Sequence, residues 1–258
     1  NNRPAAYSKD NVPYKPKHYF PISLKGVKEG DFTMVFGYPG RTQEYLPAIA
    51  VAQMADVINP MKIGIRDVIL KTQDSFMRND PEIKIKYASK YASIANYWKK
   101  WIGEAQRLKK SGAVAIKQKQ EEEFKKDIES HSRKAEYGTV LPEMEKLYAQ
   151  ALDYSVASDL FSEFMRHIDL LNNGYKIMQN VLLQRGEEAF NEKKAELLQS
   201  FKTTYKNYDK TVDKAVFEKA VAYYAKNLPK QFLPPNLQNF NAKLLTGKLY
   251  NNSFLASY

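Results

Sequence analysis

The spacing of apolar residues is helical almost without interruption from about Gln43 to the end of the 258-residue chain, and this pattern constrains the fold most. The region shows neither a fixed-period repeat nor sustained heptads, which argues against a solenoid or a simple coiled coil. The sequence therefore predicts a mainly α, multi-helix domain over residues 43–258.

Local signals predict where several of these helices begin and end. Asn59-Pro60 places a capping side chain before a proline, and the helix that follows is expected to run from Met61 to about Met77. Asp80-Pro81 repeats the signal for a helix that reaches about Lys110 and is closed by Ser111-Gly112. Asp213 is expected to cap the later helix KAVFEKAVAYYAKN.

The first 42 residues differ from the rest. Residues 1–21 are polar and rich in proline, which is typical of extended chain or loop. Phe32–Phe36 is a β-branched and aromatic run between glycines, so we expect a short strand there, with Ile22–Val27 as a partner strand. Because two short strands cannot form a stable sheet alone, they would belong to a sheet with strands outside this chain. We therefore expect a short β segment over residues 1–42.

The N-terminal sequence NNRPAAYSKDNVPYKPKH has no initiator Met, no basic n-region and no apolar h-region. It has the character of a surface loop, and we expect the chain to be a fragment of a larger protein. No apolar run approaches the ~18 residues that a membrane-spanning helix needs, so we expect no membrane partner.

The net charge of +11 is compatible with nucleic acid, an anionic membrane or an acidic partner. The basic residues are mostly Lys interleaved with Glu, as in KQKQEEEFKKDIESHSRK, which is the pattern of solvated helix faces. We therefore expect no nucleic-acid partner. A basic helical binding or adaptor module remains the alternative function, and salt-dependent binding to DNA or heparin would reveal it.

Residues for catalysis or metal binding are scarce. The chain has no cysteine, and His18, His131 and His167 form neither HExxH nor a close pair with a carboxylate at ligand spacing. The nucleophile motif G-x-S-x-G, a Walker loop and G-x-G-x-x-G are all missing. We therefore expect no catalytic residue, no metal site and no cofactor in this chain.

One helical stretch, KYASIANYWKKWIG, carries an unusual interior Asn. One stripe of the helix is aromatic and apolar, which indicates a packing face; its members are Tyr87, Tyr91, Ile94, Trp98 and Trp101. A second stripe is small and polar: Ser89, Ser93, Asn96, Lys100 and Gly103. By these patterns Asn96 is a structural amide, a ligand contact or a solvated side chain, and the residues alone leave the three alternatives open.

Three blocks of the sequence carry a family resemblance: DNVPYKPKHYFPISLKGVKEGDFTMVFGYPGRT, DPEIKIKYASKYASIANYWKKWIG and LNNGYK. They resemble the family S46 dipeptidyl peptidases, bacterial exopeptidases of the dipeptidyl-peptidase 7 and 11 type. The resemblance is strong over about residues 9–110 and looser beyond. It implies a chymotrypsin-like double β-barrel with an inserted helical domain that caps the active-site cleft. Residues 1–42 would then be the end of the first barrel, and residues 43–258 the cap domain.

The resemblance also implies a function for the parent enzyme, a serine protease that releases dipeptides from free peptide N-termini. Its Ser-His-Asp triad lies outside this chain, His18 is not part of it, and the isolated fragment is expected to be inactive. By the family's NYWK motif, Asn96 binds the substrate α-amino group, with Tyr97 and Trp98 as supporting residues. The implied partner is an oligopeptide N-terminus, in the periplasm or at the cell surface of a Gram-negative bacterium. A homodimeric parent is compatible with the resemblance.

Overall fold

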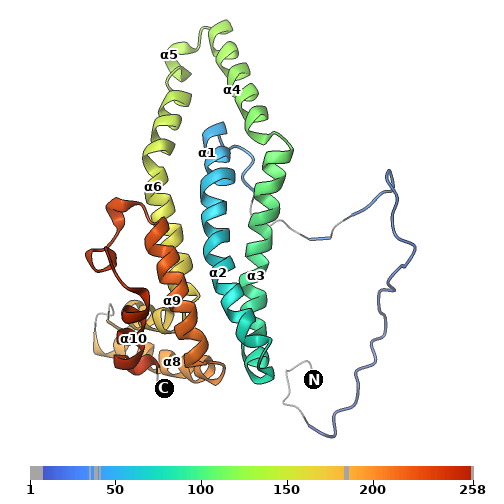
Figure 1. Cartoon of the computed structure of the whole chain (residues 1–258). Helices are drawn as coiled ribbons and strands as arrows, with labels where there is room; N and C mark the ends of the chain where they lie inside the picture. The colour runs from blue at the N-terminus through green and yellow to red at the C-terminus, as the bar shows by residue number, and fades with distance from the viewer. Residues whose placement is uncertain (1–7, 35, 38–39, 41, 183–185, 257–258) are drawn as a thin grey trace. The chain divides into compact units, whose positions relative to one another are not determined.

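The computed structural model describes residues 8–34, 36–37, 40, 42–182 and 186–256. The chain forms two compact units, residues 1–43 and 44–258. Every helix among the described residues lies in the second unit (Figure 1). Within the described ranges, no helix is long and apolar enough to cross a membrane. The prediction of a mainly α chain is confirmed.

The described residues of the first unit do not form the predicted β segment. Ile22–Val27 and the described part of 32–36 are irregular backbone, while Val35 lies outside the described residues. Phe32 and Phe36 are almost fully exposed, so these apolar side chains contact no sheet that would hold a strand. The physical reason is the one that limits any isolated hairpin, since two short strands bury too little apolar surface to be stable.

The second unit begins with one continuous helical rod. It comprises α1 (Ala48–Gln53), a π-helical turn η1 (Met54–Ile58) and α2 (Asn59–Met77). The prediction that Asn59 caps a new helix is wrong, because Ile58 already has helical φ and ψ angles of −68° and −52°. The π turn widens the helix just before Pro60, whose ring would otherwise crowd the carbonyl four residues earlier.

Helix α3 follows the predicted signals more closely. Helix α3 (Pro81–Lys110) begins where Asp80 Oδ1 accepts hydrogen bonds from two first-turn N–H groups, at 2.8 and 3.2 Å. It ends at Ser111 and at Gly112, whose φ of 64° suits glycine. Helix α4 (Ala113–Ser130), the short α5 (Lys134–Tyr137) and α6 (Val140–Arg166) then form a hairpin that extends beyond α1 (Figure 1).

Most of the remaining helices lie beside the opposite end of α2 (Figure 1). In chain order the remaining elements are α7 (Asp169–Ile177), the π turn η2 (Met178–Leu182), α8 (Glu187–Lys206), α9 (Lys210–Asn227), the 3-10 turns η3 (Lys230–Phe232) and η4 (Pro235–Leu237), α10 (Ala242–Asn252) and the 3-10 turn η5 (Phe254–Ala256). Helix α9 packs on α2, and α10 packs on α9.

Helix α2 is the centre of the core, because it contacts α3, α6 and α9. Ile65 and Ile69 on α2 and Leu160 on α6 are completely buried. The aromatic stripe predicted on α3 is a packing face, as expected. Tyr87, Ile94 and Trp101 are buried, and Tyr91 and Trp98 are partly buried against the same core.

Asp213 has a different role from the predicted one. Helix α9 is capped by Asp209, whose carboxylate accepts from two N–H groups of the first turn at 2.9 and 3.0 Å. Asp213 instead points at α7, where it accepts from the N–H groups of Asp169 at 2.7 Å and Leu170 at 3.1 Å. The hydroxyl of Tyr250 on α10 donates to the same carboxylate at 2.7 Å. One buried carboxylate therefore joins α7, α9 and α10.

The Asp213 carboxylate makes the stability of the fold dependent on pH. Burial, reinforced by the charge of Asp169, raises the pKa of Asp213 from 3.8 to about 7. Between these values the folded chain holds a proton that the unfolded chain has lost, so the contribution of Asp213 to stability falls as pH rises. We expect the difference in unfolding free energy between wild type and Asp213→Asn to fall between pH 4 and 7, by on the order of 2 kcal/mol. Urea unfolding followed by circular dichroism measures this difference, and a flat or rising difference would contradict the prediction.

Two helical glycines should respond to alanine with opposite sign. A Cβ at Gly64 on α2 would lie 2.1 Å from the hydroxyl of Tyr223, which donates to the Met61 carbonyl at 3.1 Å. Gly64→Ala must displace this ring, so we expect a loss of about 1–3 kcal/mol. A Cβ at Gly103 on α3 would meet nothing within 4 Å. Gly103→Ala should therefore stabilise the chain by about 0.5–1 kcal/mol, and equal effects in urea unfolding would show the packing analysis to be wrong.

Candidate functional site

Asn96 lies on the outer face of α3. Nine residues, or about two and a half turns, separate it from the buried Tyr87, so the two side chains lie on opposite sides of the helix. Asn96 is exposed, and its amide has no hydrogen-bond partner among the described residues. The geometry therefore excludes a structural amide within this part of the chain. Solvent exposure and ligand contact remain.

The polar stripe around Asn96 is open along its length. Ser89, Ser93, Lys100 and Gly103 are all exposed. At Gly103 a methyl group in place of the hydrogen would still have no described neighbour within 4 Å. A second group can thus approach the α3 backbone on this face. The Asn96 amide offers such a group a carbonyl acceptor and two N–H donors.

The two aromatic residues that follow Asn96 point in different directions. Tyr97 is 53% exposed, and its ring centroid lies 5.7 Å from that of Trp101. Trp98 is half-buried against the core, and its indole N–H is buried without a partner among the described residues. Tyr97 therefore flanks the open face, whereas Trp98 anchors the opposite face of the helix.

Beneath this turn of α3 lies a buried charge cluster that the sequence analysis did not identify. Arg66 on α2 is 4% exposed and forms a two-pronged ion pair with Glu163 on α6, with Nε–Oε2 at 2.6 Å and Nη2–Oε1 at 3.1 Å. Its third nitrogen, Nη1, donates to the Ile94 carbonyl of α3 at 2.9 Å. Nothing in the sequence distinguishes Arg66 from the other cations of α2, because its partners are 28 and 97 residues away.

Glu163 is ionised in this cluster. Burial alone would raise its pKa, but the contact with His167 and the hydrogen bonds from Arg66 outweigh that effect and lower the pKa to about 2. His167 Nε2 lies 3.2 Å from Glu163 Oε2, one helical turn away on α6. The cluster pairs Arg66 with Glu163 and has His167 at its edge, which is a structural arrangement without a nucleophile.

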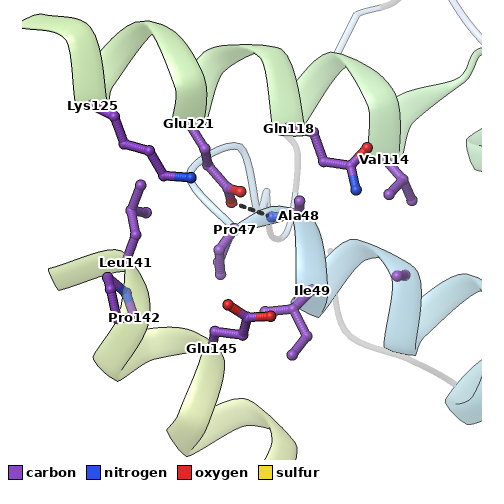
Figure 2. Close-up of a pocket in the computed structure, with 11 residues that line it drawn as sticks. Pro47, Ala48, Ile49, Val114, Gln118, Glu121, Lys125, Leu141, Pro142 and Glu145 are labelled. Atoms are coloured by element: carbon purple, nitrogen blue, oxygen red, sulfur yellow. Dashed lines mark hydrogen bonds between the residues drawn. The ribbon is translucent and has the colours of Figure 1, made fainter. Parts of the chain in front are cut away.

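A separate pocket of about 310 Å³ lies between α1, α4 and α6 (Figure 2). The Glu121 carboxylate accepts a hydrogen bond from the Ala48 N–H at 2.7 Å and so ties α4 to the start of α1. Lys125 and Glu145 lie at its rim, and Leu141 and Pro142 form an apolar wall. The pocket does not include Asn96, and its lining has no nucleophile paired with a base.

The three histidines have different surroundings. His131 is 65% exposed beside Asp127 on α4, His167 packs against Glu163, and His18 lies in the exposed first unit. Within the described ranges, no group of three or more His, Cys, Asp or Glu residues could hold a metal ion.

Comparison with known proteins gives this geometry a context. The model of the family described as Peptidase S46 matches residues 1–256. The chain is 60% identical, over its whole length, to an Asp/Glu-specific dipeptidyl-peptidase of Capnocytophaga gingivalis, and 51% identical to one of Flavobacterium psychrophilum. It also resembles the crystal structure of Porphyromonas endodontalis DPP11 in complex with the dipeptide Arg-Glu. That match has a TM-score of 0.72 and 25% identity and covers 98% of this chain.

The matches cover only part of the relatives. The chain spans 36% and 37% of the length of the two dipeptidyl-peptidases, and 37% of the crystallised chain. The alignment nevertheless includes essentially all of the chain, and the helical architecture agrees with the corresponding part of the solved structure. The chain therefore belongs to the peptidase S46 family.

Proposed function

We propose that this chain is the helical cap domain of a serine-type dipeptidyl peptidase and that it binds the α-amino group of a peptide substrate through Asn96. The observation that carries the proposal is the Asn96 amide, which is exposed and unpartnered among the described residues, on a long helix of an S46 family member. Residues 1–42 are then the end of a β-barrel that the rest of the parent protein completes.

The chemistry of the amide suits this role. A substrate α-ammonium has three N–H donors and needs acceptors in a partly closed site, and the Asn96 carbonyl is such an acceptor. Asn96 lies on the exposed side of α3, and in this proposal the other walls of the site come from outside the helical unit. Fixing the ammonium two residues from the scissile bond determines which bond reaches the nucleophile.

The reaction itself is acyl transfer by groups outside this chain. A serine attacks the scissile carbonyl, a histidine accepts its proton, and an aspartate orients the histidine. Backbone N–H groups stabilise the oxyanion that forms. In this scheme the cap domain selects free N-termini and sets the cleavage register, and the isolated chain does not hydrolyse peptides.

The relatives also suggest the substrate class. Those that are 60% and 51% identical are both named Asp/Glu-specific dipeptidyl-peptidases. We propose the same acidic preference for the parent of this chain, acting in the periplasm or at the cell surface of a Gram-negative bacterium.

Replacing Asn96 by Ala in the full-length enzyme tests the amine-binding role. We expect kcat/KM for a dipeptidyl substrate to fall about 10- to 150-fold, since a hydrogen bond to a charged group is worth about 1.5–3 kcal/mol. Asn96→Asp retains an acceptor and should lose less activity. Ser89→Ala, two turns earlier on the same exposed face, is the control and should stay within about twofold of wild type. Equal activity of Asn96→Ala and Ser89→Ala would rule out the role.

Fluorogenic dipeptidyl substrates test the proposed activity and its specificity. The full-length protein should release dipeptides that end in Asp or Glu faster than those that end in Leu or Lys, and an inhibitor of serine proteases should abolish the reaction. The purified 258-residue chain should release none of them. Hydrolysis by the purified chain that survives the inhibitor would disprove this assignment.

A further inference from the structure

The guanidinium of Arg66 holds the turn of α3 that carries Asn96. Its Nη1 donates to the Ile94 carbonyl at 2.9 Å, two residues before Asn96. In a helix that carbonyl already accepts one backbone N–H, so Arg66 uses its second lone pair. The contact therefore fixes the helix backbone itself.

Two aromatic rings of α3 also contact the guanidinium. The Arg66 Cζ lies 4.5 Å from the ring centroid of Trp101 and 5.6 Å from that of Tyr97. Both distances are within the range of cation–π attraction, which strengthens when the cation is shielded from water. Arg66 thus contacts α3 before Asn96, through a carbonyl, and after it, through two rings.

The other end of Arg66 is fixed to α6. The fork of the guanidinium matches the Glu163 carboxylate, so rotation of the side chain would break two charge-assisted hydrogen bonds. Arg66 is 4% exposed and Glu163 is 6% exposed. A buried ion pair is a weak source of net stability, because desolvating its charges costs about as much as their attraction returns. The geometry of this pair is better explained by the fixed position it gives α3.

We infer that Arg66, held by Glu163, is a positioning residue that sets the Asn96 turn of α3 at the height and rotation needed to contact the substrate amine. The inference rests on the proposed function of Asn96. The inference predicts that replacing Arg66 lowers kcat/KM through its effect on Asn96. The loss should occur even when the helical domain stays folded.

The chain contains a matched control one helical turn away. Lys62 on α2 pairs with Asp159 on α6 at 3.0 Å, and both residues lie four positions before Arg66 and Glu163. Lys62 Nζ also lies over the Trp101 ring, 4.7 Å from its centroid. Among the described residues, however, Lys62 donates no hydrogen bond to the α3 backbone. The two pairs share the helices and the ring but differ in the contact at Ile94.

The experiment compares the two pairs in the full-length enzyme, with and without Asn96→Ala. Arg66→Met/Glu163→Leu removes both buried charges together and leaves neither unpaired. We expect it to lower kcat/KM about 5- to 30-fold in the wild-type background and less than about twofold in the Asn96→Ala background. Lys62→Met/Asp159→Leu should stay within about twofold of its parent in both backgrounds.

The outcomes distinguish failure of the positioning inference from failure of the proposed amine-binding role of Asn96. If Asn96→Ala alone leaves kcat/KM unchanged, the amine-binding role fails. If Asn96→Ala weakens the enzyme and the Arg66 variant lowers kcat/KM equally in both backgrounds, Arg66 is only structural and the positioning inference is wrong. Circular dichroism checks folding of each variant. If the double variant does not fold, Arg66→Lys replaces it in the experiment, because lysine keeps the charge but cannot bridge Glu163 and Ile94. The fall in kcat/KM caused by Arg66→Lys must likewise disappear in the Asn96→Ala background.

Discussion

Helix α2 is enclosed by α3, α6 and α9, and the rest of the helical unit depends on how its buried polar groups are paired. Water cannot solvate those groups, so each needs a hydrogen-bond partner within the protein. Asn59 reaches Glu104 on α3, and Arg66 reaches both Glu163 on α6 and the α3 backbone. Gln73 Oε1 is an exception, since it has no partner among the described residues. These pairings fix the relative position of α2, α3 and α6 more closely than apolar contact alone, which is not directional.

The same principle operates at the other end of the unit through Asp213. Its carboxylate satisfies two N–H groups at the start of α7 and the hydroxyl of Tyr250, in a place that excludes water. A helix start usually takes its cap from the residue just before it, but α7 takes it from α9. Ionisable side chains inside this domain therefore act as connections between helices. The candidate binding group, Asn96, is by contrast exposed and pairs with none of the described residues.

This contrast supports the proposed division of labour in the parent peptidase. In that proposal the helical unit supplies a rigid element with an exposed amide, and the reacting groups come from outside this chain, which spans 36% and 37% of the length of two relatives. A binding group on a long packed helix keeps its position with little ordering cost when the substrate arrives. The family could be predicted from sequence because two long blocks and one short block carry it. The exposure of Asn96 could not be predicted from sequence, because the pattern allowed either an amide hydrogen-bonded to a neighbour or a solvent-exposed amide.

The sequence by itself determined the helical class, the aromatic packing face of α3, and the limits of α3 at Asp80-Pro81 and Ser111-Gly112. Each of these depends on residues within a few positions of one another, where the periodicity and the caps are local properties. Only the tertiary structure decided the partners of Arg66 and Asp213, the continuation of α1 into α2 through Pro60, and the lack of a strand at 32–34. Those outcomes depend on groups tens of residues away, or on a sheet that the described residues do not supply. Their free energy comes from desolvation and pairing in three dimensions, which no short stretch of sequence encodes.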